Sequence, residues 1–327
     1  MPLLPVPDYL PPLPLRRPHL STLYPTLLRP APPCGPVRRE RVNTPDGDFL
    51  TVDRHPSRIG ASRKLAVISH GLEGDARRKY VLGMARMATG LGFDAACWNQ
   101  RGCGGEPNLL PRSYHSGETG DLHAVIIHCL KHGGYDRVAL IGFSMGGNQI
   151  LKYLGEDPDR VPGEVAAAAT FSVPVDLGGS ERMLARPSRR VYVEYFMRGL
   201  RAKVREKEAL FPERVGRGLL RGVFTLRDFD NRYTAPYHGF ADAADYYARA
   251  SSLPVLGAIR VPALLVNALN DPFLTPSCFP KDAALANPNL FLETPRYGGH
   301  VGFAAPGPEN VYWSERRAAA FLAERMA

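Results

Sequence analysis

The sequence has 327 residues, a length that fits one large domain or one domain with an insertion. Hydrophobic residues make up 44% and charged residues 22%, which excludes a mostly disordered chain and a fibrous repeat. Lys and Arg outnumber Asp and Glu by 41 to 32, a net charge of +9, and no apolar run approaches the ~20 residues of a membrane span.

Proline dominates the N-terminal segment, residues 1–40. Twelve of the 31 prolines lie in the first 36 residues. Because proline lacks an N–H donor and fixes φ, we expect this segment to be extended rather than helical. Interspersed apolar side chains, such as Leu23 and Tyr24, predict that it packs on the core. The segment has no leading basic region and its apolar run is broken, so a signal peptide is not expected.

From residue 48 onward, strand-like and helix-like segments alternate. Apolar or alternating runs predict strands, and apolar side chains at helical spacing predict helices. Short connections favour a mostly parallel sheet with helices on both faces, formed by residues 41–175 and 254–327. The expected strands are 49–54, 64–71, 93–99, 137–143, 164–173, 262–269 and 290–294, and the expected helices are 77–90, 118–132, 145–154, 277–286 and 310–325.

Residues 176–253 interrupt this alternation and have helical periodicity without a strand-like run. Twelve basic and five acidic residues lie between Glu181 and Arg221, a local charge of +7. We expect a helical, basic cap over the strand ends, because an insertion that follows a strand there lies over the ligand site of an α/β sheet. Within it, residues 190–207 have an amphipathic pattern.

Ser144 is the strongest candidate nucleophile. It is the centre of "GFSMG", a G-x-S-x-G pattern between an expected strand and an expected helix. The turn is so tight that Gly142 and Gly146 must lack side chains. It lifts the hydroxyl above the strand end, at the positive end of the next helix.

A serine hydroxyl needs a general base, and the base needs an acid that orients it. His300 follows Ser144 late in the chain, on a glycine-rich loop, and is the expected base. Asp271 directly follows the strand 262–269 and is the favoured acid. A helix-capping or turn role is the alternative for Asp271, and Asp176, which follows the preceding strand, is the competing acid.

Two backbone N–H groups are expected to form the oxyanion hole that acyl transfer requires. Met145 directly follows the nucleophile, and Leu72 lies on the loop after the strand 64–71. The same loop contains His70 and Asp75 in an H-x-x-x-x-D pattern typical of acyltransferases. This pattern is weaker evidence for a catalytic His70 than the loop's position is for an oxyanion-hole role. Cys103 has no evident base partner, and we expect it to be inert.

Several motifs together resemble the YheT-like branch of the α/β-hydrolases. They are "HGLEGD", "NQRGCGG", "YHSGETGDL", "GFSMGGN", "TAPYHGFADAADYY", "NALNDPF" and "GGHVGF", in family order from about residue 15 to 305. The resemblance implies an α/β-hydrolase fold with an eight-stranded sheet and a Ser144–Asp271–His300 triad. It also implies action on carboxylic esters, such as short acyl esters or acylglycerols.

These features predict a serine esterase that needs no cofactor and no metal. Acyl transfer to an alcohol is the alternative within enzymes, and a non-catalytic binding protein on the same fold is the alternative of another class. The basic residues lack RNA-binding motifs, so a nucleic-acid partner is not expected. Five cysteines without a C-x-x-C pair favour a reduced, cytoplasmic chain. A peripheral contact of the basic cap with an anionic membrane is a further hypothesis.

Overall fold

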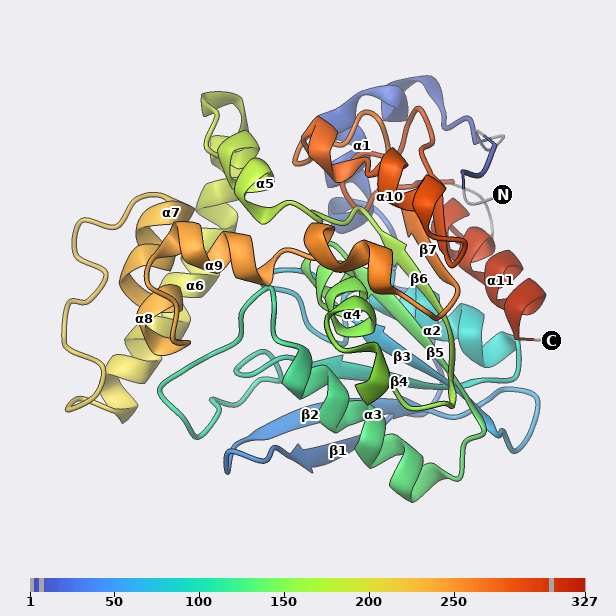
Figure 1. Cartoon of the computed structure of the whole chain (residues 1–327), viewed down its shortest axis with the longest axis horizontal. Helices are drawn as coiled ribbons and strands as arrows, with labels where there is room; N and C mark the ends of the chain where they lie inside the picture. The colour runs from blue at the N-terminus through green and yellow to red at the C-terminus, as the bar shows by residue number, and fades with distance from the viewer. Residues whose placement is uncertain (1–2, 6–8, 306–308, 327) are drawn as a thin grey trace.

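The protein is built around one eight-stranded sheet, seen near the centre of Figure 1. The computed structural model describes residues 3–5, 9–305 and 309–326. The strand order is β1-β2-β4-β3-β5-β6-β7-β8. Its strands are β1 (Arg38–Asn43), β2 (Phe49–His55), β3 (Lys64–Ser69), β4 (Asp94–Asn99), β5 (Arg137–Phe143), β6 (Val165–Phe171), β7 (Ala263–Val266) and β8 (Leu290–Glu293).

The pairing confirms the mostly parallel sheet that the sequence predicts. Strands β4, β3, β5, β6, β7 and β8 are parallel, and β2 is antiparallel to both β1 and β4. Strand β1 was not predicted. Its sequence "RRERVN" is mostly charged, and only Val42 is buried, opposite Leu50 of β2. Charged side chains are common on an edge strand because they discourage pairing with another chain.

Helices cover both faces of the sheet (Figure 1). Along β3, Leu65 and Val67 belong to one apolar cluster and Ala66 and Ile68 to another, so both faces of the strand are buried. This two-sided burial explains the continuous apolar runs in the sequence. Helices α3 (Thr119–Gly133), α4 (Met145–Glu156) and α10 (Lys281–Ala286) pack on the first cluster, and α2 (Lys79–Gly90) and α11 (Trp313–Arg325) on the second.

The N-terminal segment is not extended throughout, so that prediction is wrong for residues 13–27. A 3-10 turn, η1 (Leu13–Arg16), is followed by the helix α1 (Pro18–Leu27). Pro14 and Pro18 stand in the first turns, where an N–H has no partner within the helix, and proline is therefore tolerated. The Tyr9 hydroxyl donates to the Ala304 carbonyl at 3.0 Å, and Leu15 packs with Ala304 and Tyr312.

The insertion 176–253, all of which is described, contains helices and loops and no strand. Its helical segments lie together at one end of the sheet, on the left of Figure 1. They are α5 (Leu177–Leu184), η3 (Pro187–Arg189), α6 (Arg190–Leu210), α7 (Leu226–Phe229), the π-helical η4 (Asp230–Thr234), α8 (Ala235–Tyr237) and α9 (Ala243–Ala250). No helix in the described part of the chain is long and apolar enough to cross a membrane.

Candidate active site

Ser144 stands on a strained turn between β5 and α4. Its φ is +52°, a left-handed conformation that is unfavourable for a residue with a side chain. The turn needs glycine on both sides: a Cβ at Gly142 would lie 2.7 Å from the Gly146 carbonyl oxygen, and a Cβ at Gly146 would lie 2.5 Å from that of His70. The Ser144 N–H donates to the Phe171 carbonyl at 2.9 Å, which fixes the turn to β6.

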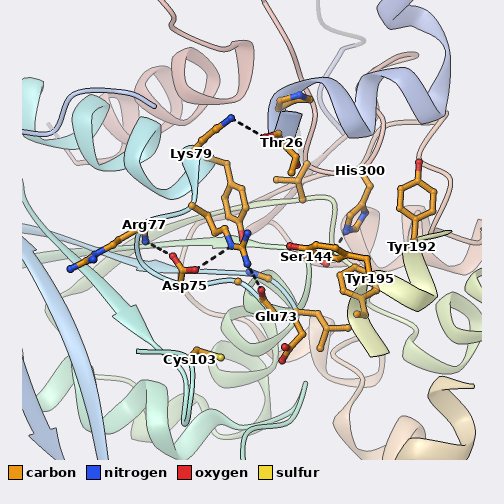
Figure 2. Close-up of a pocket in the computed structure, with 18 of the residues that line it drawn as sticks. Thr26, Glu73, Asp75, Arg77, Lys79, Cys103, Ser144, Tyr192, Tyr195 and His300 are labelled. Atoms are coloured by element: carbon orange, nitrogen blue, oxygen red, sulfur yellow. Dashed lines mark hydrogen bonds and ion pairs between the residues drawn. The ribbon is translucent and has the colours of Figure 1, made fainter. Parts of the chain in front are cut away.

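The structure brings Ser144, His300 and Asp271 together from three distant parts of the chain. Figure 2 shows the Ser144 and His300 side chains facing each other, with Nε2 of His300 2.9 Å from Ser144 Oγ. Nδ1 of His300 lies 2.9 Å and 3.2 Å from the two carboxylate oxygens of Asp271. An Nδ1–H that donates to Asp271 leaves Nε2 free to accept the serine proton.

The Asp271 carboxylate is fully buried. One of its oxygens also accepts the Phe273 N–H at 2.9 Å, and the Phe273 ring packs on the His300 ring with centroids 4.2 Å apart. The competing acid, Asp176, is occupied elsewhere. Its carboxylate accepts the Gly179 N–H at 2.9 Å, which caps α5, and the Ser277 hydroxyl at 2.6 Å. Asp176 therefore caps α5, a role that its sequence context had not indicated.

The two expected oxyanion donors lie next to Ser144. Met145 is the first residue of α4, and its N–H has no acceptor within the helix. Leu72 follows Gly71, at which a Cβ would lie 3.1 Å from Ser144 Cβ. Among the described residues, neither the Leu72 nor the Met145 N–H donates to a protein acceptor. Both groups can therefore donate to an oxygen of a bound ester.

His70 is not available for chemistry at the cleft. It is fully buried, with Nδ1 2.8 Å from the Gly71 carbonyl oxygen and Nε2 accepting the Gln100 N–H at 3.2 Å. Burial lowers the pKa of His70 to about 4, so the ring is neutral near pH 7. Asp75 accepts the Arg77 N–H and pairs with Arg78 instead of His70. This arrangement does not favour the acyltransferase reading of the H-x-x-x-x-D pattern.

Burial raises the pKa of the Cys103 thiol to about 12. The thiol therefore stays protonated, as an unreactive cysteine does. Arg101, in the same loop, is buried and pairs with Asp48 and Asp121, at 2.9 Å and 2.6 Å. The loop 99–105 is thus held by a buried charge network. In the described ranges, no group of three or more His, Cys, Asp or Glu side chains is arranged to hold a metal ion.

Two cavities meet at Ser144. The larger is a groove of about 640 Å³, lined on one side by α1 and on another by residues 71–80. The smaller is a chamber of about 110 Å³, lined largely by apolar side chains of the insertion, including Leu184 and Phe229. Ser144 and His300 line both, together with Leu72, Phe196 and Phe273. A reacting ester carbonyl at Ser144 would therefore have space on two sides.

Three polar contacts hold the loop that carries His300. The His300 N–H donates to Thr22 Oγ1 at 3.0 Å, the Val301 N–H to Ser172 Oγ at 2.8 Å and the Gly299 N–H to Asn270 Oδ1 at 2.9 Å. The sequence patterns did not predict a supporting role for Thr22, Ser172 or Asn270. Ser172 and Asn270 follow strands, and a polar residue at a strand end could have been predicted to lie near the site. The sequence around Thr22 gives no indication of a contact with His300.

Comparisons with known proteins agree with this fold. A family model for the alpha/beta hydrolase fold matches residues 67–304. The inferred esterase YheT of Escherichia coli is 35% identical over 87% of this chain and 84% of its own. Mouse phospholipase ABHD3 is 33% identical, with coverage of 85% and 70%. A yeast monoacylglycerol lipase is 30% identical, with coverage of 81% and 59%.

Solved structures show the same fold at low sequence identity. The esterase Pf2001 of Pyrococcus furiosus superposes with a TM-score of 0.61 at 17% identity, over 89% of this chain and 91% of its own. At this identity the likeness concerns the architecture, an α/β sheet with helices on both faces.

Proposed function

The chain belongs to the α/β-hydrolase fold family, in the branch that contains YheT, and from this premise we propose that it hydrolyses carboxylic esters through an acyl-enzyme on Ser144. The observation that carries the proposal is the continuous hydrogen-bonded path from Ser144 Oγ through the His300 ring to the Asp271 carboxylate, with both links at 2.9 Å. Relatives named as an esterase, a phospholipase and a monoacylglycerol lipase support the ester bond as the target.

In the first step, Ser144 Oγ attacks the ester carbonyl carbon while His300 Nε2 takes the hydroxyl proton. The carbonyl oxygen becomes an oxyanion, which the Leu72 and Met145 N–H groups stabilise. Such preorganised donors are worth about 10²–10³-fold in rate each. Asp271 accepts the Nδ1–H bond and stabilises the imidazolium that forms. The carbon–oxygen bond to the alcohol then breaks, and His300 gives its proton to the departing alkoxide.

In the second step, water replaces the alcohol. His300 Nε2 removes a proton from water as the water oxygen attacks the acyl carbon. The bond to Ser144 Oγ breaks, Oγ regains a proton from His300, and the carboxylic acid leaves. An added alcohol could act in place of water in this step. Acyl transfer is therefore the alternative outcome of the same machinery, and product analysis with an alcohol present beside water separates the two reactions.

The unequal sizes of the two cavities indicate where the two groups of a bound ester lie. We assign the smaller group of the ester to the chamber of about 110 Å³ and the larger group to the groove of about 640 Å³. This division fits short acyl esters and acylglycerols. The groove also has exposed apolar side chains along its lining, with Leu27 67%, Val191 73% and Tyr195 51% exposed. Together with the basic cap, they support a peripheral contact with an anionic membrane surface that delivers the substrate.

The central test is Ser144→Ala in a panel of esters of graded acyl length. We expect hydrolysis to fall by about 10³-fold or more, as for the loss of a triad nucleophile. A serine-directed fluorophosphonate should label the wild type and leave the variant unlabelled. Near wild-type turnover by a folded Ser144→Ala variant would refute the proposal.

A further inference from the structure

Glu73 occupies a position in the oxyanion loop that usually requires glycine. The Gly74 N–H donates to the Gly71 carbonyl at 3.0 Å, which closes a turn with Leu72 and Glu73 at its centre. Glu73 has a φ of +53°, in the left-handed region that turns of this kind normally fill with Gly or Asn. A glutamate there is disfavoured unless its side chain holds it in place.

The Glu73 carboxylate is held by the buried Tyr114 and the partly buried Lys203. The Tyr114 hydroxyl accepts the Glu73 N–H at 3.1 Å and donates to Glu73 Oε1 at 2.5 Å. Burial raises the pKa of Tyr114 well above its ordinary value, so this hydroxyl remains a donor. Lys203 Nζ donates to both carboxylate oxygens, at 2.9 Å and 2.7 Å. The Glu73 side chain is only 6% exposed, so these charge-assisted bonds are weakly screened.

Lys203 belongs to α6, the long helix of the cap, whereas Glu73 belongs to the core. One turn earlier on α6, a methyl group at Gly199 would lie 1.9 Å from Glu73 Oε2. The helix backbone therefore packs directly on the carboxylate. This contact joins the cap to the turn that presents the Leu72 N–H next to Ser144.

We propose that Lys203 and Glu73 are positioning residues that couple the seating of the cap to the geometry of the oxyanion hole. The inference rests on the proposed role of Leu72 in ester hydrolysis. If Lys203 is lost, the Glu73 carboxylate loses its direct ion pair, while Arg78 still donates only to the Glu73 carbonyl oxygen, and Glu73 can relax toward a negative φ. Leu72 and Gly74, its neighbours in a four-residue turn, must absorb that change, so the Leu72 N–H turns away from the oxyanion. A seated cap thus completes the hole over bound substrate.

Lys207 provides a matched control on the same helix. It lies one turn beyond Lys203, is 2% exposed, and donates to the carbonyl oxygens of Asn108 and Leu110, both at 2.7 Å. It therefore anchors α6 to the core without a contact to the oxyanion loop. Replacement of either lysine by Met removes one ammonium group from a contact between cap and core, but only Lys203→Met releases Glu73.

The test compares an ester with its thionoester, in which sulfur replaces the carbonyl oxygen and accepts hydrogen bonds poorly. In the wild type, the oxyanion hole should favour the oxygen ester strongly. For Lys203→Met we expect kcat on the oxygen ester to fall about 10–100-fold, less than the 10²–10³-fold loss of a donor outright. KM should change little, and the preference for oxygen over sulfur should fall by a similar factor. Lys207→Met should retain the wild-type preference.

Glu73→Gln, which keeps the shape of the side chain and removes its charge, should shift the preference in the same direction as Lys203→Met. It also serves where Lys203→Met does not fold, as judged by thermal unfolding. An unchanged oxygen-to-sulfur preference in folded variants at residues 73 and 203 would overturn the inference, and so would an equal shift in Lys207→Met. Failure of the proposed function looks different: the wild type itself would hydrolyse neither substrate and would not react with a fluorophosphonate at Ser144.

Discussion

His300 and Thr22, 278 residues apart in the sequence, are joined by a hydrogen bond from the His300 N–H to Thr22 Oγ1 at 3.0 Å. The Thr22 hydroxyl in turn donates to the Pro18 carbonyl at 2.7 Å, within α1. Nearby, Asn270 Nδ2 donates to the Arg16 carbonyl, and Asn270 Oδ1 accepts the Gly299 N–H. The N-terminal segment thus supports the loop that presents His300, the proposed general base, in addition to lining the groove.

Thr22→Val should reduce catalysis without unfolding the protein. The substitution keeps the side-chain shape but leaves the His300 N–H unpaired, at a cost of about 1–3 kcal/mol if that group stays buried. We expect kcat to fall about 10-fold, because His300 loses a support for its orientation toward Ser144. Thr22→Ser retains the hydroxyl and should behave like the wild type. Equal activity of the Val and Ser variants would show that this bond does not position His300.

The sheet could be predicted because its strands carry their own signal. A parallel strand buried on both faces must be a continuous apolar run, as in β3, β5 and β6. Strand β1 lacked that signal because it buries Val42 alone, and its pairing with β2 decides its conformation. Helix α1 was missed because a count of prolines ignores where they stand, and Pro18 occupies a position in which its missing N–H is not needed.

The candidate triad could be predicted because each member follows a strand or forms a recognisable turn, in a fixed chain order. The residues that hold the triad and the oxyanion loop in place could not be predicted. Glu73 and Lys203 are 130 residues apart, and their contact depends on how α6 lies over the core. No local pattern encodes such a docking, although Glu73 stood within the motif "HGLEGD". The cytoplasmic location and the membrane contact stay predictions.

Asp271→Asn should reduce ester hydrolysis by about 10³–10⁴-fold, because an amide in this place favours the wrong tautomer of His300. Asp176→Asn should reduce activity far less, since Asp176 caps α5 and does not touch His300. A greater loss in Asp176→Asn would transfer the acid role to that residue.

Asp230 should make the folding stability depend on pH. Burial raises the pKa of this carboxyl to about 6, although Thr234 and Tyr247 donate to it. Between about pH 4 and 6 the folded state holds a proton that the unfolded chain releases. The stability contributed by that proton is present below about pH 4 and is lost as the pH rises through 6. Arg227 and Glu181, which also face this group, counteract each other.

Urea unfolding at pH 5 and pH 7 checks this assignment. The free energy of unfolding should fall between the two pH values by about 1 kcal/mol more in the wild type than in Asp230→Asn. Asp245→Asn, on the exposed side of the same cap, removes a carboxyl without a buried environment and should keep the wild-type difference. The same pH dependence in the wild type and in Asp230→Asn would contradict the assignment.

Leu184→Ala should change which esters are accepted. Leu184 lines the small chamber, and its truncation makes room for a longer group. Each further methylene that enters should improve kcat/KM by about fourfold, corresponding to about 0.8 kcal/mol per buried methylene. Leu23→Ala, on the wall of the large groove, should leave the length preference unchanged because that space is already open. An identical length profile in all three proteins would refute the assignment of the chamber.

The last prediction concerns the basic cap. Helix α6 exposes Val191 and Tyr195 beside the groove and carries Arg198 and Arg205 among its exposed basic residues. A basic residue near an anionic bilayer contributes about 1 kcal/mol to binding, and apolar side chains add to it where they enter the interface. We therefore expect reversible sedimentation with anionic vesicles at low salt, weakened at high salt, and little binding to neutral vesicles.

Charge reversal separates the cap from the overall charge of the protein. The double variant Arg198→Glu and Arg205→Glu should lose vesicle binding. The control, Arg38→Glu and Lys131→Glu, makes the same change in net charge at exposed positions of β1 and α3. This control variant should keep most of the vesicle binding. Equal losses in the two double variants would indicate attraction by net charge alone. Equal binding to neutral and anionic vesicles, or no binding at low salt, would leave α6 as a cap helix with a solvated basic face and no membrane role.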